Sequence, residues 1–226
     1  MNTEAVVDLQ DVSIFQGDNL VLSNLNVKVH KGEFVYLIGK TGSGKSSLLR
    51  TLYADLPLKQ GEISIAGYQL SSIKTRDIPF LRRKLGIIFQ DFQLLMDRTV
   101  EENLRFVLQS TGWNAKAEMD MQIDGVLAKV GLATKKHKMP HQLSGGEQQR
   151  LGIARALMNN PQVIIADEPS GNLDPETTAE ILQLLLDIAE GGCAVLVATH
   201  DLTLFELHRA RTLKCDGGNI IDSDLL

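Results

Sequence analysis

The sequence is poor in cysteine, with only Cys193 and Cys215 among its 226 residues. Neither has a spacing typical of metal ligands, and two cysteines in a chain of this length do not make a disulfide scaffold. We therefore expect both to be reduced thiols in the core.

Long apolar runs are also absent. The best of them, 163–166 and 194–198, are only long enough for strands, and residues 1–10 lack the charged and apolar regions of a signal peptide. We expect no segment to cross a bilayer, so a role at a membrane would require docking through a partner.

Basic residues form no long block, and 23 Lys and Arg stand against 28 Asp and Glu, a formal net charge of -5. This balance argues against a broad nucleic-acid footprint, and we expect no nucleic-acid partner. No repeat, low-complexity segment or flexible linker divides the chain, and 43% hydrophobic residues can fill a core. We expect one folding unit over residues 1–226.

Strand-forming stretches dominate the first third of the chain, at 6–15, 25–30, 34–38 and 62–65, with a helix beginning at Lys45. They predict a mixed sheet that leads into a βα unit. The apolar runs 86–89, 163–166 and 194–199 lack alternation, which predicts central parallel strands covered on both faces. Helical patterns at 100–109 and 115–130 predict a helical subdomain, at about 91–160, inserted into this α/β core.

A glycine-rich segment, GKTGSGKS at 39–46, follows the apolar strand 34–38 and leads into a leucine-rich helix. This pattern in this context is typical of a phosphate-binding loop. The backbone N–H groups and the helix N-terminus would surround phosphate oxygens, Lys45 would reach the β and γ phosphates, and Ser46 would offer its hydroxyl to Mg²⁺. The alternative is a chance glycine-rich turn before a helix.

The apolar strand 163–166 ends in two adjacent carboxylates, Asp167 and Glu168. Two negative charges at a buried strand end are costly unless a cation lies between them, and Mg²⁺ would supply it. Asp167 would then hold the metal directly or through water, and Glu168 would polarise the water that attacks the γ phosphate. In isolation, an exposed acidic turn before Pro169 would explain the pair equally well.

Polar side chains also follow two other predicted strands, Gln90 after 86–89 and His200 after 194–199. Ligands of open α/β sheets bind at the carboxyl edge of the strands. Gln90 could orient water or complete the Mg²⁺ shell, and His200 could contact the γ phosphate. Either residue alone is more often structural, so the prediction depends on their agreement with Asp167 and Glu168.

The segment LSGGEQQR at 143–150 precedes a helical run at 151–158. Ser144 can cap this helix, with Glu147 completing a capping box. The box does not explain Gly145 and Gly146, which permit close approach of another group. We expect a second helix N-terminus that receives phosphate.

These motifs together resemble the nucleotide-binding domain of ABC ATPases over essentially the whole chain. The family order is Walker A at 39–46, Q-loop at Gln90, signature at 143–149, Walker B at 163–168, D-loop at 170–174 and switch histidine at His200. The resemblance implies an α/β P-loop NTPase fold with a RecA-like core, an N-terminal antiparallel β-subdomain and an inserted α-helical subdomain. It also implies ATP hydrolysis with Mg²⁺.

The resemblance assigns roles to individual residues. Phe15 would stack on adenine, although tyrosine is commoner there, and Ser47 and Ser170 stand where many members have threonine. Catalysis would use Glu168, His200 and Gln90, and the metal would be held by Ser46, Gln90 and Asp167. The ATP-binding residues would be Phe15, Gly39, Lys40, Thr41, Gly42, Ser43, Gly44, Lys45, Ser46 and Ser47. Ser144, Gly145, Gly146 and Glu147 would complete the site of a second copy, with Asp174 in the D-loop, so that ATP closes a head-to-tail homodimer.

Within the family, the segments LSGGEQQR, ADEPSGNLD and LLMDRTV (94–100) are similar to those of the group that contains the FtsE cell-division ATPases and the lipoprotein-release and MacB-type ATPases. The FtsE resemblance implies an FtsX-like membrane partner, control of septal cell-wall hydrolysis and a place at the cytoplasmic face of the cell membrane. A lipoprotein-release or MacB-type exporter subunit is the alternative.

Three other classes of ATPase-related protein fit the sequence less well. A chromosome-structure ATPase would need a coiled-coil insertion, a translation-type factor would carry two such domains, and a non-hydrolysing nucleotide switch would lack Glu168. Leu94, Leu95 and Met96, just after Gln90, are either core of the helical subdomain or a docking surface for the partner.

Overall fold

The computed structural model describes residues 5–201 and 203–223. The strands are β1 (Ala5–Gln16), β2 (Asn19–His30), β3 (Phe34–Ile38), β4 (Gln60–Ile65), β5 (Tyr68–Gln69), β6 (Leu85–Ile88), β7 (Val163–Asp167), β8 (Ala194–Thr199), β9 (Arg211–Asp216) and β10 (Asn219–Asp222). The helices are α1 (Lys45–Leu52), α2 (Ile78–Arg83), α3 (Val100–Ser110), α4 (Lys116–Lys129), α5 (Gly145–Leu157), α6 (Pro175–Glu190) and α7 (Thr203–Leu207). Short 3-10 turns lie at 70–72, 75–77, 133–135 and 140–142.

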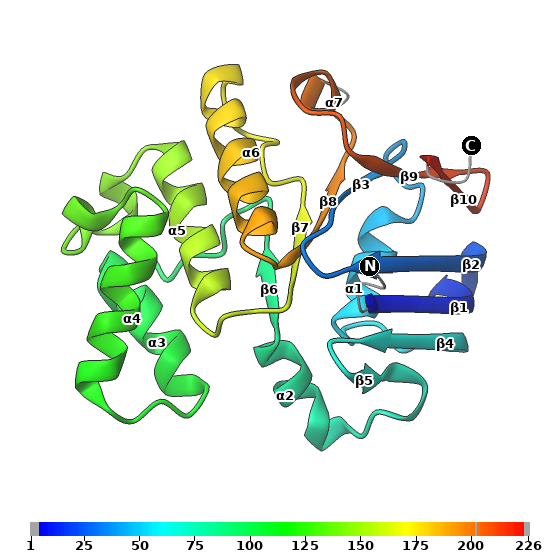
Figure 1. The fold of residues 1–226 in the computed structure, drawn as a ribbon, viewed down its shortest axis with the longest axis horizontal. Coiled ribbons are helices and arrows are strands. Elements are labelled where there is room, and N and C mark those ends of the chain that lie inside the picture. The colour runs from blue at the N-terminus through cyan, green and yellow to red at the C-terminus, as the bar shows by residue number, and fades with distance from the viewer. Residues whose placement is uncertain (1–4, 202, 224–226) are drawn as a thin grey trace.

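Two sheets divide the strands. A four-stranded antiparallel sheet has the order β2-β1-β4-β5, and a six-stranded sheet has the order β10-β9-β3-β8-β7-β6. Figure 1 shows the antiparallel sheet on one side of the molecule, the parallel strands in the middle and α3, α4 and α5 on the other side. The α/β class and the antiparallel β-subdomain are confirmed.

The expectation of one mixed sheet in the first third needs correction. β3 does not pair with β1 or β2. It pairs in parallel with β8 and β9, so β3 belongs to a different sheet from β1 and β2. Every residue of 34–37 is buried, whereas β2 alternates between buried and exposed positions. A strand buried on both faces fits the centre of a parallel sheet, and an alternating one fits a half-exposed antiparallel sheet. β2 also begins at Asn19, earlier than the predicted 25.

The parallel sheet is covered on both faces, as its unbroken apolar strands predicted. Tyr36, Val195 and Val197 point into a core shared with α3 to α6, and Val35 and Leu196 point into a second core shared with α1 and the antiparallel sheet. Because both faces of the sheet are packed, the ends of its strands, which carry the polar motifs, are held in place. Both cysteines are free thiols, Cys215 buried and Cys193 half-buried.

The segment between β6 and β7 contains α3, α4 and α5, in agreement with the helical patterns. α3 begins at Val100 as expected, and α4 covers 116–129 of the predicted 115–130. α5 begins at Gly145, directly after Ser144 and six residues before the predicted run. No helix within 5–201 and 203–223 has the length and apolarity that a membrane span requires.

Candidate functional site

The phosphate loop, the acidic pair and the histidine lie at one edge of the six-stranded sheet. β3, β8 and β7 are adjacent and parallel, so their carboxyl ends, at Ile38, Thr199 and Asp167, lie side by side. This is the edge at which open α/β sheets bind ligands. The sheet order therefore brings together residues that are more than a hundred positions apart in the sequence.

Lys45 lies in the middle of this edge and is only 6% exposed. Its Nζ donates hydrogen bonds to the carbonyl oxygens of Gly39 at 2.8 Å and Lys40 at 3.4 Å, and lies 4.0 Å from Glu168 Oε1. The loop thus folds around a buried ammonium group. A positive charge held in this way is suited to contact an anion that enters the loop.

Two glycines give the loop its shape. Gly39 has φ 156 and Gly44 has φ 100. A Cβ atom at Gly39 would lie 2.7 Å from the Cys215 carbonyl oxygen, and one at Gly44 would lie 2.7 Å from Val21 Cγ1. Gly44 directly precedes α1 and provides no side-chain cap, so no side chain caps the first N–H groups of α1, which follow the loop directly. Uncapped N–H groups at a helix N-terminus form an anion site.

Glu168 is in direct contact with His200. His200 Nδ1 lies 2.8 Å from Glu168 Oε1, and the His200 backbone N–H donates to Glu168 Oε2 at 3.3 Å. Glu168 also adopts a left-handed backbone with φ 49, which costs a non-glycine residue on the order of 1–3 kcal/mol. Its carboxylate is therefore fixed between the imidazole and the Lys45 ammonium, and sequence reasoning had not predicted this direct pairing.

Asp167 has the environment expected of a metal ligand. Burial raises the pKa of its carboxyl, a hydrogen bond from Ser46 lowers it, and the neighbouring charge of Glu168 raises it. Its Oδ1 is buried and has no hydrogen-bond partner among the described residues. A carboxylate and a hydroxyl are the oxygen ligands that Mg²⁺ prefers, so Asp167 and Ser46 fit this ion.

Gln90 lies against the D-loop and not, by any described contact, against Asp167 or Lys45. The Asn172 side chain donates to the Gln90 carbonyl oxygen at 3.4 Å, and a Cβ atom at Gly171 would lie 3.1 Å from Gln90 Nε2. Within the D-loop, Asp174 caps α6. It accepts from the Thr177 hydroxyl at 2.6 Å and from the Thr177 N–H at 3.0 Å, and these hydrogen bonds lower the pKa of its carboxyl.

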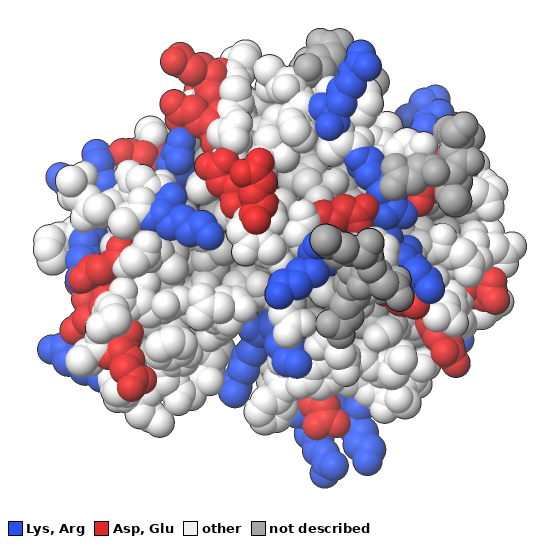
Figure 2. Space-filling model, in the orientation of Figure 1, with Lys and Arg blue, Asp and Glu red and all other residues white. Residues whose placement is uncertain are grey.

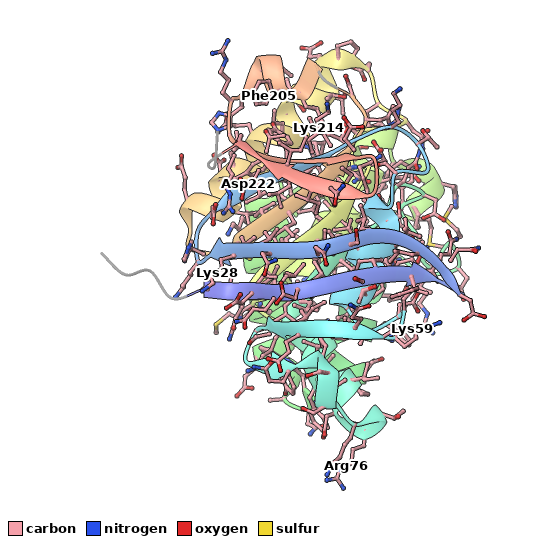
Figure 3. All side chains as sticks on the ribbon, turned by 90° about the vertical axis from the view of Figure 1, so that its right-hand side faces the viewer. Lys28, Lys59, Arg76, Phe205, Lys214 and Asp222 are labelled. Carbon is pink, nitrogen blue, oxygen red and sulfur yellow. The ribbon has the colours of Figure 1, made fainter. Side chains whose placement is uncertain are left out.

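Phe15 is half-buried at the end of β1 and pairs with Leu20 across the β1–β2 hairpin. The next residue of β2, Val21, approaches Gly44, so Phe15 lies near the rim of the phosphate loop. Lys59 Nζ lies 5.5 Å from the centre of its ring and also donates to the Gly17 carbonyl oxygen at 2.7 Å. Figure 3 shows Lys59 beside the antiparallel sheet, and sequence reasoning had missed it because it lies 44 positions from Phe15 (59 - 15 = 44).

The signature segment has the expected capping box. Ser144 Oγ accepts from the Glu147 N–H at 3.2 Å, and Glu147 Oε2 accepts from the Ser144 N–H at 2.9 Å. Contacts within the chain explain why residue 146 is glycine, because a Cβ atom there would lie 2.4 Å from Thr177 Cγ2. Gly145 has no such clash, since its nearest neighbour, Leu173 Cδ2, would be at 3.5 Å. Gly145 is therefore the better candidate for contact with another molecule.

The outer side of the phosphate loop lines a cavity of about 420 Å³. Thr41 and Lys40 contribute to it from the loop, His200 from the end of β8 and Lys214 from β9. Lys214 is labelled on β9 in Figure 3. Of the remaining predicted residues, Ser43 has a buried Oγ without a described partner, and Ser47 accepts from the Thr51 hydroxyl through its carbonyl oxygen at 2.9 Å.

Comparison with known proteins identifies the family. The model of the family described as "ABC transporter" matches residues 22–171. This chain belongs to that family. The ABC protein is 40% identical to the cell division ATP-binding protein FtsE of Streptococcus pneumoniae D39, over 96% of this chain and 94% of that protein. It is 43% identical to FtsE of Mycobacterium tuberculosis over 88% of this chain and 86% of that protein, and 40% identical to FtsE of Escherichia coli K12 over 91% and 92%.

Solved structures agree with this assignment. The dimeric structure of a bacterial ABC transporter cassette has a TM-score of 0.81 at 33% identity and covers 95% of this chain and 96% of that one. A post-hydrolysis dimer of the same cassette, with ADP and phosphate bound, matches equally well. The cbiO1 protein of Clostridium perfringens, part of the ABC transporter complex cbiONQ, has a TM-score of 0.87 at 27% identity, covering 96% and 87%.

Proposed function

We propose that this ABC protein is the ATP-binding and ATP-hydrolysing subunit of a membrane complex that acts in cell division. The observation that carries the proposal is the meeting of Lys45, Glu168 and His200 in a chain at least 40% identical to FtsE proteins over most of its length. The reaction is attack of water on the γ phosphate, which yields ADP and phosphate.

The residues divide the work by position. The uncapped start of α1 and the Lys45 ammonium bind the phosphates, and Phe15 offers its ring to adenine. Glu168 lies next to Lys45, where its carboxylate can accept a proton from the attacking water, and His200 orients that carboxylate through the 2.8 Å contact. Mg²⁺, when bound by Ser46, Asp167 and Gln90, would neutralise charge on the phosphates.

ATP joins two copies of the chain in this proposal. The α5 N-terminus is remote in sequence from the phosphate loop, and Gly145 at its start has space for a neighbour. A two-fold arrangement would place this start on the nucleotide held by the other copy. The dimeric cassettes of the same fold support this arrangement.

The membrane partner is an FtsX-like subunit, and a groove between α2, β6 and α3 is the proposed docking site. Its cavity of about 530 Å³ includes Leu85, Ile87, Phe89 and Val107, together with three arginines and no carboxylate. Figure 2 shows a hollow beside the helical region bordered by basic side chains. We propose that a short amphipathic helix of the partner fills it, with apolar side chains on its floor and carboxylates facing the arginines.

The residues at 94–96 differ in whether they belong to the core or could form a docking surface. Leu94 packs against the core, whereas Met96 is 53% exposed. Leu95 is half-buried, and its backbone is held on both sides by the buried Asn103, at 2.9 Å and 3.0 Å. A charge at Leu95 would therefore disturb the loop as well as a docking surface, so it is a poor test of docking. Through this partner, the protein would lie at the cytoplasmic face of the cell membrane.

Copurification and phosphate release test the function together. The tagged chain, expressed with the membrane protein encoded beside its gene, should bring that protein down and hydrolyse ATP. Ser110 lines the groove and is exposed, so Ser110→Trp should fill the groove and Arg83→Glu should reverse part of its charge without a change in fold. Both should lose the partner and keep basal hydrolysis. Recovery of a lipoprotein-release or MacB-type permease would favour the alternative subgroup, and full retention of the partner by both variants would exclude the groove.

A further inference from the structure

The loop after Gln90 contains two consecutive residues in the left-handed region. Phe92 has φ 58 and Gln93 has φ 48, and neither is glycine. The turn is tight, with the Gln93 N–H donating to the Asp91 carbonyl oxygen at 2.6 Å. Non-glycine residues keep such a conformation only when the surroundings hold them in it.

Arg155 of α5 is the side chain that holds this turn. Its Nη2 donates to the Phe92 carbonyl oxygen at 3.0 Å and its Nη1 donates to the Gln93 carbonyl oxygen. Arg155 is half-buried, and this partial burial lowers the pKa of its guanidinium, while the charge of Asp91 raises it. No carboxylate lies within ion-pair distance of Arg155 in the part of the chain that the structure describes. A half-buried cation whose only described hydrogen bonds are to two carbonyl oxygens of one turn is placed to fix that turn.

The helix that carries Arg155 links this turn to the signature. α5 is continuous from Gly145 to Leu157, so its first residue and Arg155 lie on one rigid element. A Cβ atom at Gly152 would lie 3.9 Å from the Phe92 carbonyl oxygen, and Ala156 packs against Gly86 of β6. A movement of α5 would therefore be passed to the backbone two residues after Gln90.

We propose that Arg155 is a positioning residue for ATP hydrolysis, which holds the strained turn after Gln90 and couples it to the signature helix. The inference rests on the proposed function of the site as an ATPase. Arg155 also lines the groove proposed for the partner, so a carboxylate bound there would compete with the two carbonyl oxygens for its guanidinium. The partner would then reach the Q-loop through one side chain.

Paired substitutions at Arg155 and Gln93 test this role in the isolated chain. Arg155→Gln should lower kcat by about tenfold or more, because a misplacement of about 1 Å can cost on the order of 10²-fold. The affinity for a fluorescent ATP analogue should stay within about twofold, because Arg155 has no described contact with the phosphate loop. Arg155→Lys should fall between Arg155→Gln and the wild type.

The matched control compares two substitutions of Gln93, to glycine and to alanine. Gln93 is exposed, and both Gln93→Gly and Gln93→Ala remove its amide, but only glycine adopts the left-handed region without cost. In the Arg155→Gln background, Gln93→Gly should recover at least about threefold in kcat and Gln93→Ala should not. If Arg155→Gln does not fold, the same comparison of Gln93→Gly with Gln93→Ala is made in the Arg155→Lys background.

Three results would overturn the proposal: wild-type kcat in Arg155→Gln, equal rescue by glycine and alanine, or rescue by neither. An inactive wild-type chain would contradict the proposed function itself, so the two failures are distinguishable.

Discussion

Helices α1 and α5 both begin at glycine-rich segments, yet their first turns are built differently. α1 follows Gly44 and has no side-chain cap, whereas α5 has the capping box of Ser144 and Glu147, and Lys135 pairs with Glu147 at 3.0 Å. The N–H groups of α1 therefore depend on an external anion, and those of α5 are partly satisfied within the chain. This difference supports the proposal that α1 forms the primary phosphate site and that α5 contributes to the site of another copy.

Removing the cation from the α1 site should have the largest effect on binding. Lys45→Ala deletes the buried ammonium and leaves only backbone donors, so affinity for ATP should fall by about 10²-fold, since loss of one partner of a buried charge contact costs about 2–5 kcal/mol. Equilibrium titration with a fluorescent ATP analogue measures this. Lys116→Ala, an exposed lysine on α4, is the control, and unchanged affinity in Lys45→Ala would contradict the assignment of the loop.

A side chain at the start of α5 should separate hydrolysis from binding. Gly145→Val adds atoms where the chain has space, so the variant should fold and bind ATP within about twofold of the wild type. Its kcat should fall by on the order of tenfold or more, because the added atoms displace the second copy. Gly146 is less informative, since a side chain there would strike Thr177 of the same chain. Equal losses in affinity and kcat would count against a shared site.

The raised pKa of Asp167 leads to a prediction about the nucleotide-free protein. Because burial disfavours the ionised carboxylate in the fold, this group destabilises the fold at neutral pH, and the destabilisation is relieved as pH falls through the raised pKa. Asp167→Asn removes the charge and should raise Tm, by roughly 2–4 °C per kcal/mol. The same variant should lose the further rise that Mg-ATP gives the wild type. A lower Tm in the absence of nucleotide would contradict this account of Asp167.

The smallest effect concerns the cap of α5. Ser144→Ala should cost about 1 kcal/mol, or roughly 2–4 °C in Tm. Thr99 forms the same capping box with Glu102 at the start of α3, away from the site, so Thr99→Ala should cost a similar amount of stability. Only Ser144→Ala should also slow hydrolysis. An equal kcat in the two variants would reduce Ser144 to a structural cap.

The parts of the site that could be predicted from the sequence are those built from local patterns. Local sequence predicts the turn formed by the glycines of 39–44, the apolar strand before Asp167 and the capping box around Ser144. Because ligands of open α/β sheets bind at the carboxyl ends of the strands, these strand ends could also be expected to lie together. The FtsE-like family assignment was confirmed by the relatives.

Contacts across long sequence separations could not be predicted in the same way. The pairing of β3 with β8 and β9, the Lys59 contact with Phe15 and the Arg155 contact with the turn at 92–93 depend on how separate elements pack. No local pattern encodes the positive φ of Glu168, because its cause is the surrounding fold. The division into one domain with an inserted helical subdomain at 91–160 stays a prediction.

The central claim is that one chain binds ATP and two chains hydrolyse it. Glu168→Gln tests it most directly, because the amide keeps the shape of the side chain and cannot take the proton from water. Its kcat should fall by about 10²–10⁴-fold while ATP still binds. Light scattering on a sizing column should then show a monomer without nucleotide and a stable dimer with Mg-ATP. A variant that hydrolyses at the wild-type rate, or that binds ATP and stays monomeric, would contradict the account.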